Sequence, residues 1–209
     1  MSKRKSDYLS KQRRRKYDGV DNDSSDDDDD KVYCRGCKVY FYADVTKKSV
    51  YMLITALDEA IRNAYTNPSN MDPCIYLYIH SDGGDAYAGL SAMDHIRSLH
   101  TKVITIADGF VASAATFILL AGYKRLGMPH CHVLIHQIRS GFWGKYDEML
   151  DEVKNSKLLM KTLTEIYRSS TRIAQNRLDS LLKQELNLNT ALCLKYGVID
   201  EIMKPYVHA

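Results

Sequence analysis

The chain has few of the residues that would mark an unusual class of protein. Its 209 residues include only four prolines and 11 glycines, which excludes a collagen-like or proline-rich disordered protein. The five cysteines are an odd number and lack the spacing of a disulfide framework, which argues against a small secreted scaffold. A net charge of +3 is too small to indicate nucleic-acid binding by itself. The length is sufficient for one globular domain with a buried core.

Long apolar runs are also missing. No apolar stretch follows the basic residues at the amino terminus, so we expect no secretory signal. The most apolar later region, residues 103–122, is interrupted by Asp108 and by hydroxyl side chains. A buried strand followed by a buried helix explains this region better than a membrane span. We therefore expect a soluble, cytoplasmic protein in a reducing compartment, with no membrane partner.

The first 30 residues differ from the rest. Residues 1–17 carry eight Lys and Arg against one acid, and residues 18–30 carry eight Asp. Neither block has enough apolar side chains to offset the entropy of ordering it, which predicts a disordered charged tail over residues 1–30. The basic block is compatible with binding to nucleic acid or to a nuclear import receptor, but a solvated tail whose two blocks attract each other explains it more simply. No nucleic-acid partner is expected, and residues 31–209 are predicted to form the functional domain.

Hydrophobic periodicity alternates between strands and helices along that domain. This alternation predicts an α/β fold with a largely parallel sheet flanked by helices. A turn is expected at Asp108-Gly109, and a polar segment before the last strand. The predicted strands are residues 39–43, 75–79, 103–107, 132–136 and 198–203, and the predicted helices are residues 47–64, 86–98, 113–120 and 146–169.

Three turns follow the carboxyl ends of predicted strands, where open α/β sheets bind ligands. Gly83-Gly84 would bring backbone N–H groups close to a substrate carbonyl, or would simply turn the chain. Ser113 precedes an apolar helix, so it is a candidate nucleophile beside unpaired N–H groups or an ordinary helix cap. His136 ends a strand and is a candidate base or a hydrogen-bonded rim residue. His132 faces the same way, but one pleat repeat further from the strand end.

Cys34-Arg-Gly-Cys37 has the spacing of two metal ligands. A zinc site requires two further ligands, and no second matching pair is present. We therefore expect no metal at this pair.

Several segments together resemble the proteolytic subunit of Clp protease, the ClpP family of serine peptidases, as a divergent member. The resemblance extends from about Val39 to Met203, with the pieces in matching order and spacing. It implies a crotonase-like α/β fold and assembly into two stacked rings. The length and apolar stripe of the predicted helix 146–169 indicate a long protruding helix for oligomer contacts, or a helix buried within its own domain. The pieces are residues 75–84, 109–114, 117–122, 133–137 and 196–200.

Positions matched to the family imply roles for individual residues. Ser113 corresponds to the nucleophile and His136 to the general base, and the N–H groups of Gly84 and Ala114 correspond to the oxyanion donors. Glu185 stands where the family has its third catalytic residue, an Asp, when positions are counted back from Tyr196-Gly197. The substitution of Glu is a departure from the family pattern, although either acid can orient an imidazole.

Asp179 is the alternative for this acidic residue, and the competing interpretation of Glu185 is a solvated surface acid. The resemblance further implies an aromatic sheet face, carrying Tyr76 and Tyr78, that helps to dock an unfoldase; an ordinary strand buried on both sides is the competing interpretation.

The resemblance predicts an ATP-dependent-type serine endopeptidase subunit that cleaves unfolded polypeptides inside a chamber, without metal or organic cofactor. The expected partners are polypeptide substrates, an AAA+ unfoldase ring, and further copies of this chain or of another ClpP-type subunit. Two alternatives come from other classes. One is a weakly active or inactive ring subunit with a structural role in assembly, and the other is a crotonase-fold acyl-CoA enzyme.

Overall fold

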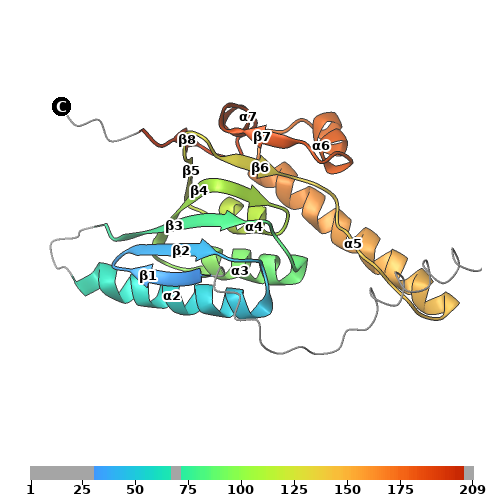
Figure 1. The fold of residues 1–209 in the computed structure, drawn as a ribbon, viewed down its shortest axis with the longest axis horizontal. Coiled ribbons are helices and arrows are strands. Elements are labelled where there is room, and N and C mark those ends of the chain that lie inside the picture. Colours follow the sequence, from blue (N-terminus) through green and yellow to red (C-terminus); the bar gives the residue numbers. More distant parts are fainter. Residues whose placement is uncertain (1–30, 67–71, 205–209) are drawn as a thin grey trace, which may run out of the picture.

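The fold is an α/β domain in which helices flank a mostly parallel sheet (Figure 1). The structure is a computed structural model that describes residues 31–66 and 72–204. The predicted fold class is confirmed. The predicted tail over residues 1–30 lies outside the described residues.

The sheet runs in the order β1-β2-β3-β4-β5-β8, and β6 pairs with both β4 and β7. The pairs β1–β2 and β6–β7 are antiparallel, and all the others are parallel. Because β3, β4 and β6 are parallel neighbours, their carboxyl ends meet at one edge of the sheet. The strands are β1 (Lys31–Arg35), β2 (Lys38–Tyr42), β3 (Cys74–Ser81), β4 (Lys102–Ala112), β5 (Lys124–Gly127), β6 (His132–Leu134), β7 (Asn187–Asn189) and β8 (Glu201–Ile202).

The helices differ in how much of their surface the domain covers. Helix α2 packs on β1, β2 and β3, and α4 packs on β3 and β4. Helix α5 instead extends away from the sheet (Figure 1). None of the helices within the described ranges is both long and apolar enough to cross a membrane. The helices are α2 (Lys47–Thr66), α3 (Ala86–Ser98), α4 (Ala115–Leu120), α5 (Tyr146–Ser170), α6 (Gln175–Leu182) and α7 (Thr190–Tyr196).

Strand β3 has two different faces, as its alternation predicts. Ile75, Leu77 and Ile79 are fully buried in the core, whereas Tyr76 and Tyr78 are half-buried on the other face. On that face a ladder of stacked aromatic rings crosses three strands. Its ring centroids lie 4.9 Å apart between Tyr33 and Tyr40 and 5.0 Å apart between Tyr40 and Tyr78.

The predicted turn at Asp108-Gly109 is wrong. Strand β4 continues through both residues to Ala112, and its register with β3 shifts in this region. Gly109 accommodates the irregularity because its φ of +75° is open to glycine. The glycine here therefore bends a strand instead of reversing the chain, and the longer β4 leads directly into Ser113.

The other differences between the predicted and the observed secondary structure concern short elements. The predicted strand 132–136 ends at Leu134, so His136 lies beyond the last paired residue. The predicted helix 113–120 begins at Ala115. The predicted strand 198–203 is reduced to β8. The segment expected to be merely polar contains α6, β7 and α7, and Leu182 of α6 accepts a hydrogen bond from the Gln137 N–H.

Candidate active site

Ser113 lies in a sharp elbow between β4 and α4. Its φ is +53°, the only positive φ of a non-glycine residue within the described ranges. Such a conformation costs about 1–3 kcal/mol and persists only where the surroundings impose it. Here the Ser113 N–H donates to the Leu134 carbonyl at 3.0 Å, and the Thr116 N–H donates to the Ser113 carbonyl at 3.0 Å. The elbow is therefore tied to both β6 and α4.

The helix-cap interpretation of Ser113 is wrong. The residue at the N-cap of α4 is Ala114, and no side chain caps this helix. The Ser113 hydroxyl forms no hydrogen bond within the described part of the chain, and the residue is half-buried at the wall of a cavity. Its oxygen is thus available to a ligand in that cavity.

The Gly83-Gly84 turn after β3 packs directly against this elbow. A Cβ atom added to Gly83 would lie 2.6 Å from Ser113 Cβ and 3.2 Å from Ala114 N, so only glycine permits the approach. Both glycines have positive φ, +99° for Gly83 and +141° for Gly84. Val45 holds the turn from the other side, because its N–H donates to the Gly83 carbonyl at 2.6 Å.

Two backbone donors remain unpaired beside Ser113. Neither the Gly84 N–H nor the Ala114 N–H donates to another group among the residues that the structure describes. Both residues line the same cavity as Ser113. An anionic oxygen in the cavity would find these donors preorganised, which is how backbone N–H groups stabilise a developing oxyanion.

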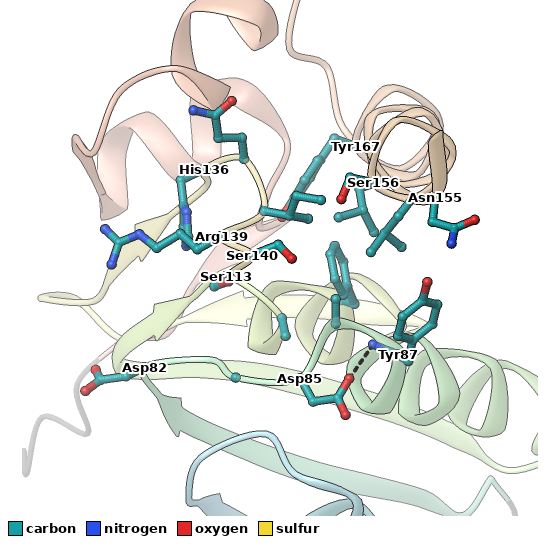
Figure 2. Close-up of a pocket in the computed structure, with 18 of the residues that line it drawn as sticks. Asp82, Asp85, Tyr87, Ser113, His136, Arg139, Ser140, Asn155, Ser156 and Tyr167 are labelled. Carbon is teal, nitrogen blue, oxygen red and sulfur yellow. Dashed lines mark hydrogen bonds between the residues drawn. The ribbon is translucent and has the colours of Figure 1, made fainter. Parts of the chain in front are cut away.

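His136 lines this cavity too, whose volume is about 510 Å³. In Figure 2, His136 and Arg139 lie on the same side of the cavity as Ser113, and Ser156 lies across from them on α5. No hydrogen bond joins His136 to the Ser113 hydroxyl within the described residues. The other histidine candidate, His132, is exposed and does not line the cavity.

The remaining lining comes from Asp82, from the start of α3, from Phe117 of α4, from the loop that follows His136 and from α5. The α5 residues supply a wall that is polar at one end and apolar at the other. The side chains on this wall are those of Glu152, Asn155, Ser156, Leu159, Leu163 and Tyr167.

Glu185 lies outside the lining but contacts Arg139, on the loop that follows His136. It follows α6, whose last residue, Leu182, accepts a hydrogen bond from the Gln137 N–H at 2.8 Å. The Glu185 carboxylate forms an ion pair with Arg139. This hydrogen bond and the charge of Arg139 lower the pKa of Glu185, and His136 contributes a smaller effect in the same direction. Glu185 is thus close enough to His136 to interact electrostatically, but it is paired with Arg139.

The alternative acid, Asp179, is turned to a different partner. It is exposed on α6 and accepts a hydrogen bond from Gln175 Nε2 at 2.8 Å. It does not line the cavity. Sequence reasoning missed Arg139, whose partner lies 46 positions along the chain, so no local pattern could have indicated it.

The Cys34 and Cys37 pair lies far from this cavity, at the turn between β1 and β2. Cys34 Sγ is 3.2 Å from the Gly36 carbonyl oxygen. The described residues contain no group of three His, Cys, Asp or Glu side chains arranged to hold a metal ion.

Comparison with known proteins gives the family. The family model described as Clp protease matches residues 39–206. The chain belongs to the Clp protease family. This match includes Gly84, Ser113, Ala114, His136 and Glu185.

Among the curated relatives in the Clp protease family, three illustrate the degree of similarity. An ATP-dependent Clp protease proteolytic subunit of Deinococcus radiodurans is 29% identical over 178 residues, which cover 81% of this chain and 87% of the relative. One from Ostreococcus tauri is 30% identical over 170 residues, covering 78% and 85%. The ATP-dependent Clp protease proteolytic subunit 2 of Treponema denticola is 38% identical over 132 residues, covering 62% and 66%.

Proposed function

We propose that this chain is a serine endopeptidase subunit of the Clp type, which cleaves unfolded polypeptides by using Ser113 as nucleophile. The observation that carries the proposal is the strained elbow of Ser113. Its unpaired hydroxyl shares one cavity with His136 and with the free N–H groups of Gly84 and Ala114. Membership of the Clp protease family supports the same assignment.

In this mechanism Ser113 Oγ attacks the carbonyl carbon of the scissile peptide bond, and His136 accepts the hydroxyl proton. The N–H groups of Gly84 and Ala114 donate to the resulting oxyanion, and each well-aimed donor contributes about 3–4 kcal/mol. The C–N bond then breaks as His136 gives its proton to the leaving amine. Water, deprotonated by His136, hydrolyses the acyl-enzyme and restores Ser113. No metal or organic cofactor takes part.

Glu185 is the proposed orienting acid, and its pairing with Arg139 defines a resting arrangement. Both side chains of the pair are well exposed, at 73% for Arg139 and 56% for Glu185. Solvent screens exposed ion pairs and makes them weak, so exchange of Arg139 for His136 as the partner of Glu185 costs little. We propose that Glu185 turns to His136 when substrate or a neighbouring subunit repositions the loop after β6, which carries both His136 and Arg139.

Helix α5 supports assembly into rings. Only Leu163 and Tyr167 of its 25 residues are buried, although Met149, Leu150 and Val153 are large apolar side chains exposed on it. An apolar helix surface of this kind is typical of a protein–protein contact. We propose that α5 packs against other copies of this chain or of a similar subunit, so that the cavities face an enclosed chamber.

The aromatic face of the sheet is the proposed docking surface for an ATP-driven unfoldase ring. The stacked rings of Tyr33, Tyr40 and Tyr78 remain partly accessible there. Aromatic side chains of this kind are enriched at protein interfaces because they combine a large apolar area with a polar tip.

A second candidate function is a ring subunit with little activity. The absence of a Ser113–His136 hydrogen bond in the described residues and the Arg139–Glu185 pair favour it. Hydrogen bonds of catalytic residues often tighten only when substrate binds, so the arrangement remains compatible with a peptidase.

Labelling by a fluorophosphonate separates these functions. The assembled protein should react and should hydrolyse unfolded polypeptide, whereas Ser113→Ala should do neither. Ser91→Ala, which removes an exposed serine of α3, should behave like the unaltered protein. An assembled protein that does not react would refute the peptidase and support the ring subunit. Thioesterase activity that survives in Ser113→Ala would instead indicate the acyl-CoA enzyme.

A further inference from the structure

A chain of buried hydroxyl groups connects helix α5 to the elbow of Ser113. Thr116 Oγ1 lies 2.6 Å from the Ser113 carbonyl oxygen and 2.7 Å from the Tyr167 hydroxyl oxygen. Thr116 is completely buried and Tyr167 is 1% exposed. Thr116 does not line the cavity, so its hydroxyl depends on these two partners for its hydrogen bonds.

The direction of each hydrogen bond follows from the number of protons. The Ser113 carbonyl can only accept, so the single hydroxyl proton of Thr116 is used in that bond. Tyr167 must then donate its own proton to Thr116 Oγ1. Burial raises the pKa of Tyr167, which keeps this donor protonated throughout the physiological pH range.

The Ser113 carbonyl thus accepts two hydrogen bonds from one residue, because the Thr116 N–H also donates to it at 3.0 Å. This carbonyl belongs to the same planar trans peptide as the Ala114 N–H, and the two groups point in opposite directions. Whatever fixes the carbonyl of Ser113 therefore fixes the direction of the Ala114 N–H. The plane can turn only through ψ of Ser113 and φ of Ala114, and the hydrogen bonds from Thr116 to the carbonyl oppose that rotation.

We propose that Thr116 and Tyr167 are positioning residues that hold the Ser113–Ala114 peptide in the orientation needed for the Ala114 N–H to bind the oxyanion. The inference rests on the proposed peptidase function. Neither hydroxyl touches the reacting atoms; both act through the peptide plane.

The same chain couples the nucleophile to α5. The Tyr167 ring packs against Phe117, with centroids 5.7 Å apart, and Arg97 Nη2 is 3.1 Å from the Ser170 hydroxyl at the end of the helix. These contacts fasten the carboxyl-terminal part of α5, whereas most of its length is uncovered. A shift of α5 on assembly would move Tyr167, and the Tyr167 hydroxyl would transmit that shift to the oxyanion donor.

The test compares Thr116→Val, Thr116→Ser and Tyr167→Phe with a matched control. Thr105 is also fully buried, and its hydroxyl donates at 2.7 Å to the Leu119 carbonyl of the same helix α4, away from Ser113. Thr105→Val thus removes an equivalent hydrogen bond without touching the elbow. Thr105→Val should lower Tm by about 2–4 °C, and Thr116→Val should lower it further because it also leaves the buried Tyr167 hydroxyl without a partner.

Activity should distinguish them. Thr116→Val should lower kcat for peptide hydrolysis roughly 10- to 100-fold, part of the loss expected for a missing oxyanion donor, with KM within about twofold. Tyr167→Phe should lower kcat by less, and Thr116→Ser should restore it. Thr105→Val should keep the original kcat. The double variant Thr116→Val/Tyr167→Phe should match Thr116→Val alone, because both changes interrupt one chain.

Unchanged kcat in folded Thr116→Val, or an equal loss in Thr105→Val, would overturn the positioning role while leaving the peptidase intact. If the unaltered protein does not react with fluorophosphonate, the proposed function itself fails. The crystal structure of Thr116→Val then decides the positioning role. A rotated Ser113–Ala114 peptide would support it, and an unchanged one would overturn it.

Discussion

Replacement of Gly84 by alanine tests the backbone geometry of the site most directly. The φ of Gly84 is +141°, and an added Cβ would lie 2.4 Å from the Val45 carbonyl oxygen. Val45 cannot retreat easily, because its carbonyl accepts from the Asp85 N–H at 2.7 Å and its N–H donates to Gly83. The alanine must therefore break this backbone pairing or rotate the Gly84 peptide.

The cost has two parts. A positive backbone φ, which residues other than glycine rarely adopt, costs about 1–3 kcal/mol. The loss of one backbone hydrogen bond costs about 1 kcal/mol. The free energy of unfolding should therefore fall by about 2–4 kcal/mol. Gly36→Ala is the matched control, because Gly36 has a φ of +61° but a Cβ there would meet nothing within 4 Å. It should lose only about 1 kcal/mol, from strain offset by a smaller unfolded-state entropy.

Urea unfolding and peptide hydrolysis measure the two consequences separately. The stability loss of Gly84→Ala should exceed that of Gly36→Ala, and its kcat per folded molecule should fall by about 100-fold or more through the misdirected oxyanion donor. Equal stability losses in the two variants would refute the steric reasoning. Full activity in a folded Gly84→Ala protein would show that the Gly84 N–H does not bind the oxyanion.

Two further predictions concern charges. Burial raises the pKa of Asp200. Hydrogen bonds from Arg125 and the charge of Arg125 lower that pKa by more, so its net value lies below the usual one. The stabilisation from the Asp200 carboxylate is complete above its unfolded-state pKa of about 4 and is lost as the pH falls through its folded-state pKa. In urea titrations, the free energy of unfolding of Asp200→Asn should therefore be about 1 kcal/mol below that of the unaltered protein at pH 7 and equal to it near pH 2. Arg139→Leu should raise kcat by up to about fivefold because it releases Glu185, and this limit is set by the weakness of an exposed ion pair. The control Lys183→Ala should leave kcat unchanged. Lower activity in Arg139→Leu would show that Arg139 assists catalysis.

Much of the fold follows from local patterns in the sequence. The strict alternation in β3 identifies its buried face because side chains of a strand alternate between two environments. Helix α3 begins and ends where its periodicity predicts, and the Asp85 side chain caps it by accepting from the N–H groups of Tyr87 and Ala88. Parallel strand order also explains why Ser113 and His136 line one cavity although they come from different strands.

The structural features that the sequence does not predict depend on residues that are distant in sequence. Strand β7 has a single buried residue, Leu188, and exists because it pairs with β6; a polar three-residue segment carries no periodicity that would reveal it. The Arg139–Glu185 pair joins two loops that are unrelated in sequence. Gly109 predicts a turn because a glycine directly after a strand usually marks one. Here the neighbouring strands on both sides hold β4 extended instead.

The conformation of Ser113 distinguishes the proposed functions more sharply than its chemistry does. A serine that merely capped a helix would have extended backbone angles and a bonded hydroxyl, whereas Ser113 has a strained φ and an unpaired hydroxyl. Three elements impose this strain: Leu134 through the Ser113 N–H, Thr116 through its carbonyl, and Gly83 by close packing. Such a concentration of constraints on one half-buried residue lowers stability without improving packing. Strain of this kind is typical of positions where function requires a particular geometry, and it favours a nucleophile over an inactive remnant.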